Sequence, residues 1–139
     1  MEIARFTFKE LFMGMEEVIE HKITLDEIKR FIDLVSDFHP LHVDKDYAIK
    51  NGFKNVIAQG FFVSSLSSSL VSMRLPGENT LILSHAFSFH KPIYPEELLT
   101  IKGVITKLDD RFLFATINID IFANEEKKAS GSIDVKVRN

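Results

Sequence analysis

The sequence predicts an α+β fold in which a curved antiparallel sheet wraps around one long central helix. Two segments before Pro76, 24–36 and 61–75, carry apolar residues at helical spacing. Beyond Gly77 the spacing of apolar residues falls to two and stays there, as expected for strands. A sheet with one apolar face must be covered, and the segment 61–75 is apolar and long enough to lie across it.

Length and composition are those of one folded domain covering residues 1–139. Hydrophobic residues make up 45% of the chain and charged residues 27%, and no repeat or Pro/Gly-rich linker divides it. The net charge of -3, with Lys and Arg scattered along the chain, argues against nucleic acid as a partner. With no Cys there is no thiolate nucleophile and no disulfide. No signal-peptide pattern and no run of about 18 apolar residues occurs, so we expect a cytoplasmic protein without a membrane partner.

The segment 24–36 is predicted to form an amphipathic helix. Its apolar face consists of Leu25, Ile28, Phe31, Ile32 and Val35. Thr24 and Glu27 have the spacing of a capping box, in which each side chain accepts from the other residue's backbone N–H. Pro40 should exclude helical geometry at the residue before it, so we expect the segment 37–42, Asp-Phe-His-Pro-Leu-His, to form a loop.

Two further helices are expected before the sheet. Asp44 is placed to cap a short helix that should stop near Gly52. The helix over 61–75 should end at Pro76, and it is rich in serine, a mediocre helix former. We infer that the small volume of serine is needed there for close approach of the sheet or of a ligand. The serines are Ser64, Ser65, Ser67, Ser68, Ser69 and Ser72.

Four alternating segments predict the strands of an antiparallel meander. They are 81–89, 99–105, 113–121 and 129–137. In the first of them, His85 alternates in phase with Leu81, Leu83, Phe87 and Phe89. This phase predicts that His85 is a buried, hydrogen-bonded core residue.

Asp37 and His42 are the candidate proton-handling pair. The chain between them contains Pro40 and is not expected to continue a helix, so the two side chains can converge on one water. Imidazole titrates near neutrality, and a neighbouring carboxylate orients or stabilises it. Two other interpretations stay open from the residues alone: Asp37 caps a turn beside a loop histidine, or Asp37, His39 and His42 bind zinc or iron.

Gly60 opens the long helix and is a candidate carbonyl-binding position. The first N–H groups of a helix have no intrahelical acceptors, so a thioester oxygen there would gain a donor and the positive end of the helix dipole. Alternatively, Gly60 only gives the backbone freedom at the helix entry. No Gly-x-Ser-x-Gly elbow is present, so Ser68 is considered a supporting hydrogen-bond donor and not a nucleophile.

Several motifs together resemble those of a known family. The run 37–44, Asp-Phe-His-Pro-Leu-His-Val-Asp, is followed by Gly52, by 57–60, Ile-Ala-Gln-Gly, and by Ser65. With these residues the chain resembles the MaoC-like dehydratases, especially the single-domain (R)-specific enoyl-CoA hydratases, over almost its whole length. Within this resemblance, 8–14 is similar to the family's opening strand and turn.

The resemblance implies a hot-dog fold, a homodimer with an acyl-thioester tunnel near the subunit interface, and no cofactor. The substrate would be a 2-enoyl thioester of coenzyme A or acyl carrier protein, hydrated reversibly to a 3-hydroxyacyl thioester. Asp37 and His42 match the family's catalytic pair. Gly60 matches the glycine whose N–H holds the thioester carbonyl, and Ser68 matches a serine near the site. A non-catalytic acyl-thioester binding or sensing module and a hot-dog thioesterase are the alternatives.

The sequence departs from the family at two positions that we expect to contact the substrate. His39 stands where the family usually has Asn, which adds a titratable ring beside Asp37 and His42. Gln59 stands where the family usually has His. We expect activity to survive with an altered substrate orientation or pH optimum, and the departures leave the length of the acyl chain open.

Overall fold

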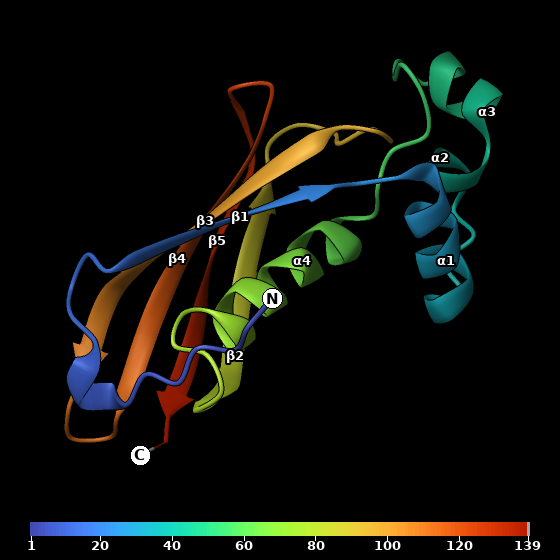
Figure 1. Cartoon of the computed structure of the whole chain (residues 1–139). Coiled ribbons are helices and arrows are strands. Elements are labelled where there is room, and N and C mark those ends of the chain that lie inside the picture. The colour runs from blue at the N-terminus through green and yellow to red at the C-terminus, as the bar shows by residue number, and fades with distance from the viewer. Residues whose placement is uncertain (139) are drawn as a thin grey trace.

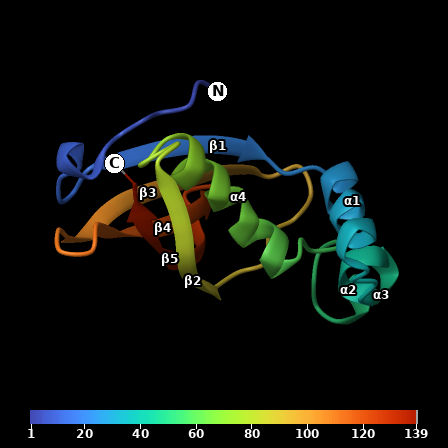
Figure 2. The same ribbon diagram turned by 90° about the horizontal axis from the view of Figure 1, so that it is seen from below.

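The computed structural model describes residues 1–138, which contain a five-stranded antiparallel sheet. The strands are β1 (Glu16–Lys22), β2 (Thr80–Phe89), β3 (Leu98–Asp109), β4 (Phe114–Ala123) and β5 (Glu126–Val137). The helices are η1 (Phe8–Glu10), α1 (Leu25–Val35), α2 (Pro40–Val43), α3 (Lys45–Lys50) and α4 (Gly60–Met73). The strand order is β1-β3-β4-β5-β2, and α4 lies along one face of the curved sheet (Figures 1 and 2). The predicted α+β fold, with a curved sheet around a central helix, is confirmed.

The core lies between α4 and the inner face of the sheet. Side chains of β3, β4 and β5 alternate between buried and more exposed positions, and Ile101, Ile117 and Val135 are fully buried. Gly103 on β3 lets the helix approach closely, because a Cβ added there would lie 2.6 Å from Leu70 on α4. Burial of these branched aliphatic side chains is the main driving force for the fold.

The sheet differs from the predicted meander in the placement of two strands. β3, β4 and β5 pair consecutively as expected, but β2 pairs with β5 and β1 pairs with β3. Of the opening strand and turn expected over 8–14, the strand was wrong, because Phe8–Glu10 forms a 3-10 helix, whereas Met13 and Gly14 do form a turn. β1 gave no strand signal, because its apolar residues Val18 and Ile19 are adjacent and do not alternate.

A β-bulge in β2 changes which of its side chains face α4. The register of β2 against β5 shifts between Ile82 and Ser84, so Leu81 before the bulge does not share a face with His85 after it. His85 is exposed, and it has no hydrogen-bond partner within residues 1–138. The prediction of a buried, hydrogen-bonded core histidine was therefore wrong. His85 does share the inner face with Phe87, but it lines an open cavity beside α4 and is not packed in the core.

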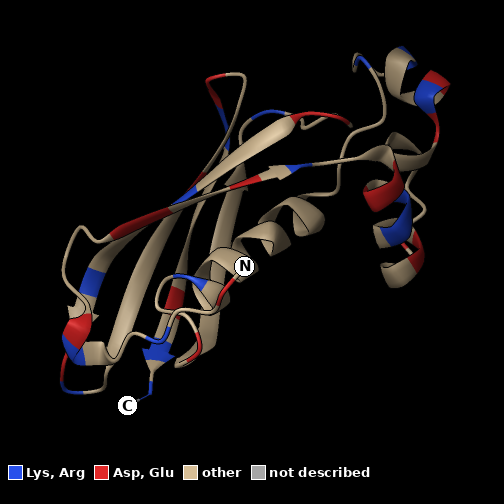
Figure 3. Cartoon of the chain, in the orientation of Figure 1, with Lys and Arg blue, Asp and Glu red and all other residues tan. Residues whose placement is uncertain are grey.

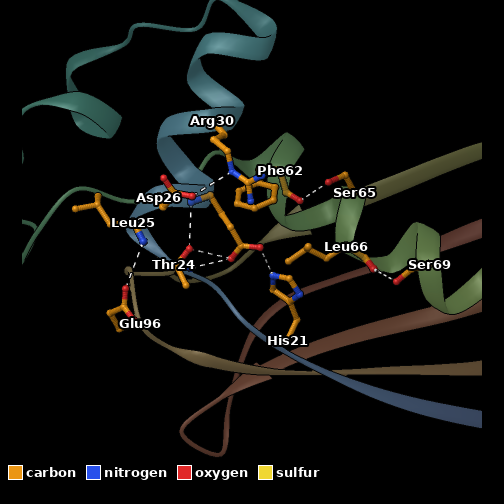
Figure 4. A network of polar contacts seen from close by, with 11 residues as sticks. His21, Thr24, Leu25, Asp26, Arg30, Phe62, Ser65, Leu66, Ser69 and Glu96 are labelled. Atoms are coloured by element: carbon orange, nitrogen blue, oxygen red, sulfur yellow. Dashed lines mark hydrogen bonds and ion pairs between the residues drawn. The ribbon is translucent and has the colours of Figure 1, made fainter. Parts of the chain in front are cut away.

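The helices α1, α2 and α3 lie together beyond the N-terminal end of α4 (Figure 1). The predicted capping box at the start of α1 is confirmed: the Thr24 hydroxyl accepts from Glu27 N–H, and the Glu27 carboxylate accepts from Thr24 N–H. His21 on β1 joins this network, with its Nε2 2.9 Å from the same carboxylate (Figure 4). The ring of Phe31 on α1 stacks on Phe62 of α4, with centroids 5.2 Å apart.

Charged side chains are found on β1, α1 and α3 but not on α4, which is uncharged along its whole length (Figure 3). An uncharged helix fits the position of α4 against the sheet, because an unpaired charge in the core would be costly. In the part of the chain that the structure describes, no helix is long and apolar enough to cross a membrane.

Candidate active site

Asp37 and His42 come close together at the junction of α1 and α2. α1 ends at Ser36, whose left-handed φ of 59° turns the chain. The segment that follows is not entirely the predicted loop, because Pro40 opens the helical turn α2 and His42 lies on that turn. Nε2 of His42 is 3.9 Å from Oδ2 of Asp37. This distance is too long for a direct hydrogen bond, but one water can lie within about 2.8 Å of both atoms.

The backbone fixes the orientation of the His42 ring. Nδ1 of His42 lies 2.7 Å from the carbonyl oxygen of Ile57, and because a carbonyl only accepts, Nδ1 carries the proton. In the neutral ring, Nε2 therefore presents its lone pair on the side of Asp37. The side chain of His42 is 14% exposed and that of Asp37 is 44% exposed. The pair thus combines a shielded imidazole with a carboxylate that water can reach.

His42 and Gly60 line the same cavity, whose volume is about 310 Å³. We call it the catalytic cavity, and its apolar walls include Val63, Phe89 and Ile93. Gly60 is the first residue of α4, and within residues 1–138 its N–H has no hydrogen-bond acceptor. A Cβ added to Gly60 would lie 2.9 Å from the ring of Phe89, so close packing favours glycine here. The cavity therefore combines a free imidazole nitrogen with a free helix N–H.

Gln59 lies next to Gly60 in the chain and is 2% exposed. Neither its amide nitrogen nor its amide oxygen has a hydrogen-bond partner in the described part of the chain. A polar group buried without a partner costs about 1–3 kcal/mol, so a water or ligand that reached this amide would be held well. Gln59 is not part of the wall of the catalytic cavity, however, and a substrate placed there would not touch it directly.

His39 and Ser68 lie outside the wall of the catalytic cavity. Nδ1 of His39 accepts the N–H of Leu41 at 3.2 Å, which caps α2. The ring centroids of His39 and His42 are 5.8 Å apart. The backbone N–H of His39 donates to Oδ1 of Asp37 at 3.3 Å. Ser68 lies further along α4, on a separate cavity. Among residues 1–138, no group of three or more His, Cys, Asp or Glu side chains is arranged to hold a metal ion.

Sequence reasoning missed the charged rim of the catalytic cavity. Lys91 lines the cavity, and its Nζ lies 2.9 Å from Oε2 of Glu126. Nζ of Lys128 lies 3.2 Å from Oε1 of the same carboxylate. The hydrogen bond from Lys91, and then the one from Lys128, lowers the pKa of the Glu126 carboxyl. Because Lys91 and Glu126 are 35 residues apart, only the pairing of β2 with β5 could have revealed this rim.

Comparisons with known proteins place the chain in a family. A family model described as a MaoC like domain matches residues 10–125, which include Asp37, His42 and Gly60. The chain belongs to the MaoC-like family. This membership confirms the resemblance drawn from the motifs at 37–44 and 57–60.

MaoC-like relatives and solved structures are similar to the chain over most of its length. The (R)-specific enoyl-CoA hydratase of Aeromonas caviae is 30% identical over 112 residues, which are 81% of this chain and 84% of the relative. A 3-hydroxybutyryl-CoA dehydratase of Methylorubrum extorquens is 24% identical over 136 residues, 98% of this chain and 87% of the relative. The solved structure of an (R)-hydratase from A. caviae matches with a TM-score of 0.88 and 28% identity, covering 93% of this chain and 98% of that one. The chain therefore has the hot-dog fold, and its relatives support hydration or dehydration as the general reaction.

Proposed function

We propose that this MaoC-like protein catalyses the reversible addition of water to a 2-enoyl thioester of coenzyme A or acyl carrier protein, forming a 3-hydroxyacyl thioester. The observation that carries the proposal is the free Nε2 of His42, which lies 3.9 Å from Oδ2 of Asp37, together with the presence of His42 and Gly60 in the wall of one cavity where α4 begins. The names of the similar proteins, a hydratase and a dehydratase, agree with this chemistry. By its resemblance to the (R)-specific hydratases, the product would have the (R) configuration.

In the proposed reaction, Asp37 and His42 hold one water against C3 of the enoyl group. The water oxygen bonds to C3, and the proton that it loses is taken up by the pair and delivered to C2. As the new C–O bond forms, the electron pair of the C2=C3 bond shifts towards the thioester carbonyl. The N–H of Gly60 donates to the oxygen where negative charge then develops, and the positive end of the α4 dipole adds to this stabilisation. Dehydration is the same sequence in reverse.

Three further residues have supporting roles in the proposed site. His39 caps α2 and donates its N–H to Asp37, so it holds the backbone that carries the pair. Gln59 places an unpaired amide next to Gly60, where a water held with the substrate would satisfy it. Ser68 would meet the acyl part of the substrate further along α4.

We also propose that the chain is a single domain that forms a homodimer through β2. β2 is an edge strand of 10 residues with β5 on one side only. Three of its apolar side chains are substantially exposed, Leu81 at 55%, Leu83 at 48% and Phe89 at 50%. Pairing with β2 of a second copy would satisfy the free backbone edge and cover part of this surface. The cytoplasmic location expected from the sequence stays a prediction.

Asp37→Asn and His42→Ala test the proposed reaction. Each should lower kcat/KM for hydration of 2-enoyl-CoA by about 100- to 10,000-fold, because each removes one positioned acid-base group. The measurement is the loss of enoyl-thioester absorbance with substrates of several chain lengths. Asp33→Asn is the matched control, because Asp33 is an exposed carboxylate one turn earlier in the chain. Circular dichroism should show the same fold in all variants.

Three results would contradict the proposed hydratase. Full turnover by both Asp37→Asn and His42→Ala would show that the pair is not the catalytic group. Tight binding of acyl thioesters by the wild type without any turnover would indicate a binding or sensing module. Release of free coenzyme A from a saturated acyl-CoA would indicate a thioesterase.

A further inference from the structure

A second cavity, of about 360 Å³, runs along the exposed side of α4 next to β2. We call it the serine groove, and define it by Phe61, Ser65, Ser68, Ile82, His85 and Phe87. It lies directly beside the catalytic cavity: Phe61 follows Gly60 on α4, and Phe87 is the inward-facing residue of β2 next to Phe89. The two cavities therefore follow one another along the same helix and strand.

The serine hydroxyls of the groove are largely turned away from its space. The hydroxyl of Ser64 donates to the carbonyl of Phe61 at 3.1 Å, and that of Ser65 donates to the carbonyl of Phe62 at 2.6 Å (Figure 4 for Ser65). The hydroxyl of Ser67 likewise donates to the carbonyl of Ser64 at 2.6 Å. Such bonds satisfy the hydroxyls within the helix itself. The serines therefore give the groove room without making most of its wall polar.

Two polar groups in the groove have no such internal partner. His85 and Ser68 are both exposed to solvent, and within residues 1–138 neither the imidazole nor the hydroxyl takes part in a hydrogen bond with the protein. The ring of His85 only meets the edge of Phe87, at a centroid distance of 6.0 Å. His85 comes from β2 and Ser68 from α4, on opposite walls of the groove. An otherwise apolar groove thus carries two hydrogen-bonding groups that a ligand could reach.

Both groups lie at a similar distance from the start of the catalytic cavity. Ser68 is eight residues beyond Gly60, which corresponds to about 12 Å along an α-helix. His85 is four residues before Phe89, which corresponds to about 13 Å along a strand. An extended chain advances about 1.2 Å per bond, so about ten bonds reach from a thioester carbon at Gly60 to these two groups.

We infer that the serine groove binds the tail of a medium-length acyl thioester that carries an oxygen at its far end, and that His85 and Ser68 hydrogen-bond this oxygen. The inference rests on the proposed function, because it requires the thioester carbonyl to lie at Gly60. A hydroxyl and a carboxylate share the chemistry that His85 would recognise, since imidazole donates to and accepts from oxygen. Pairing of β2 with a second copy uses backbone groups in the plane of the sheet, whereas His85 projects towards α4 and stays in the groove.

The test compares four coenzyme A thioesters with the wild type and three variants. The substrates are crotonyl-CoA, 2-decenoyl-CoA, 10-hydroxy-2-decenoyl-CoA and the monothioester of 2-decenedioic acid. For the wild type, kcat/KM should be about tenfold higher with one or both oxygenated C10 substrates than with 2-decenoyl-CoA, the value of one added hydrogen bond. His85→Leu should abolish this difference in kcat/KM between the oxygenated and plain C10 substrates, and His85→Gln should keep part of it. Ser88→Ala, on the outward face of the same strand, should keep all of it.

The hydroxyl and carboxyl substrates distinguish the two sources of the terminal oxygen. If only the carboxylate substrate is preferred, His85 binds a charged terminal group. If both oxygenated substrates are preferred equally, His85 makes a hydrogen bond that does not depend on charge. The inference would be overturned if the wild type did not prefer the oxygenated C10 substrates over 2-decenoyl-CoA, or if His85→Leu kept the wild-type preference. The proposed function would still stand in either case, provided that the protein hydrates crotonyl-CoA. Calorimetric binding of saturated decanoyl-CoA and its ω-carboxyl analogue measures the same preference without turnover. A protein that hydrates none of the four substrates but keeps the His85-dependent binding preference would refute the hydratase and support the groove.

Discussion

Two regions of the molecule, the sheet with α4 and the segment from α1 to α3, differ in how their residues are packed internally. In the sheet, β3, β4 and β5 pair along most of their length, and their inward residues are almost completely buried. In the segment from α1 to α3, which the structure describes completely, the buried residues are Ile28, Ile32 and Ala48. The well-buried part supplies Gly60, Val63 and Phe89 to the wall of the catalytic cavity, and the less buried part supplies His42 to the same wall and Asp37 beside it. We therefore expect the fold and the proposed chemistry to be separable in this molecule.

The segment from α1 to α3 is joined to the rest by a small number of identifiable contacts. Phe31 stacks on Phe62, and the His21 ring meets the capping box of α1. Nδ1 of His42 donates to the carbonyl of Ile57, which leads into α4. Changes in the sheet should lower the stability of the whole molecule, whereas changes near α1 to α3 should affect activity and local opening first.

Ile117→Ala should have the largest effect on stability, and it tests the sheet side of this comparison. Ile117 is fully buried at the centre of β4, so its truncation leaves a cavity and should cost about 2–5 kcal/mol. The measurement is the free energy of unfolding in urea. Asn118→Ala, on the exposed face of the same strand, should change it by less than about 0.5 kcal/mol. Equal effects of the two substitutions would mean that β4 is not packed as described.

Much of the sheet could be predicted because alternation records burial directly. The inward residues of β3, such as Ile101 and Gly103, and those of β5, such as Ala129 and Val135, were placed on the correct face by spacing alone. The bulge at Ile82 and Ser84 was not predictable in this way, because one extra residue reverses the face without changing the composition. Strand order also escaped prediction, since nothing in the spacing says which edge β2 joins.

The candidate site was predictable where one short segment carries it. Asp37 and His42 are close in sequence, so a loop or a helical turn both bring their side chains together. Phe89 and Lys91 were not predicted to belong to the site. Their position beside Gly60 depends on how the end of β2 and the residues after it pack against the start of α4. Ser68 was expected near the pair, but the helical rise carries it to the serine groove.

Gly60→Ala should have the next largest effect, at the point where the two regions meet. The added methyl would lie 2.9 Å from the half-exposed ring of Phe89, so the ring or the helix entry must move. We expect kcat/KM to fall by about 10- to 100-fold, because the proposed thioester donor is displaced. Gly60→Ala combined with Phe89→Leu should recover part of this loss. Unchanged kinetics in the single variant would show that the position of this N–H is not critical for turnover.

Thr24→Ala should have the smallest effect, and it tests whether α1 opens separately from the sheet. The substitution removes the hydroxyl that accepts from Glu27 N–H at 3.1 Å, which should cost α1 about 1 kcal/mol. If the two regions are separable, amide hydrogen exchange should become faster in α1 while the slowest amides of β3 and β4 keep their rates. Lys29→Ala, at an exposed position in the same helix, is the matched control. Uniformly faster exchange, including the sheet, would mean that α1 unfolds only together with the core, because the lost cap would then lower the stability of a single cooperative unit.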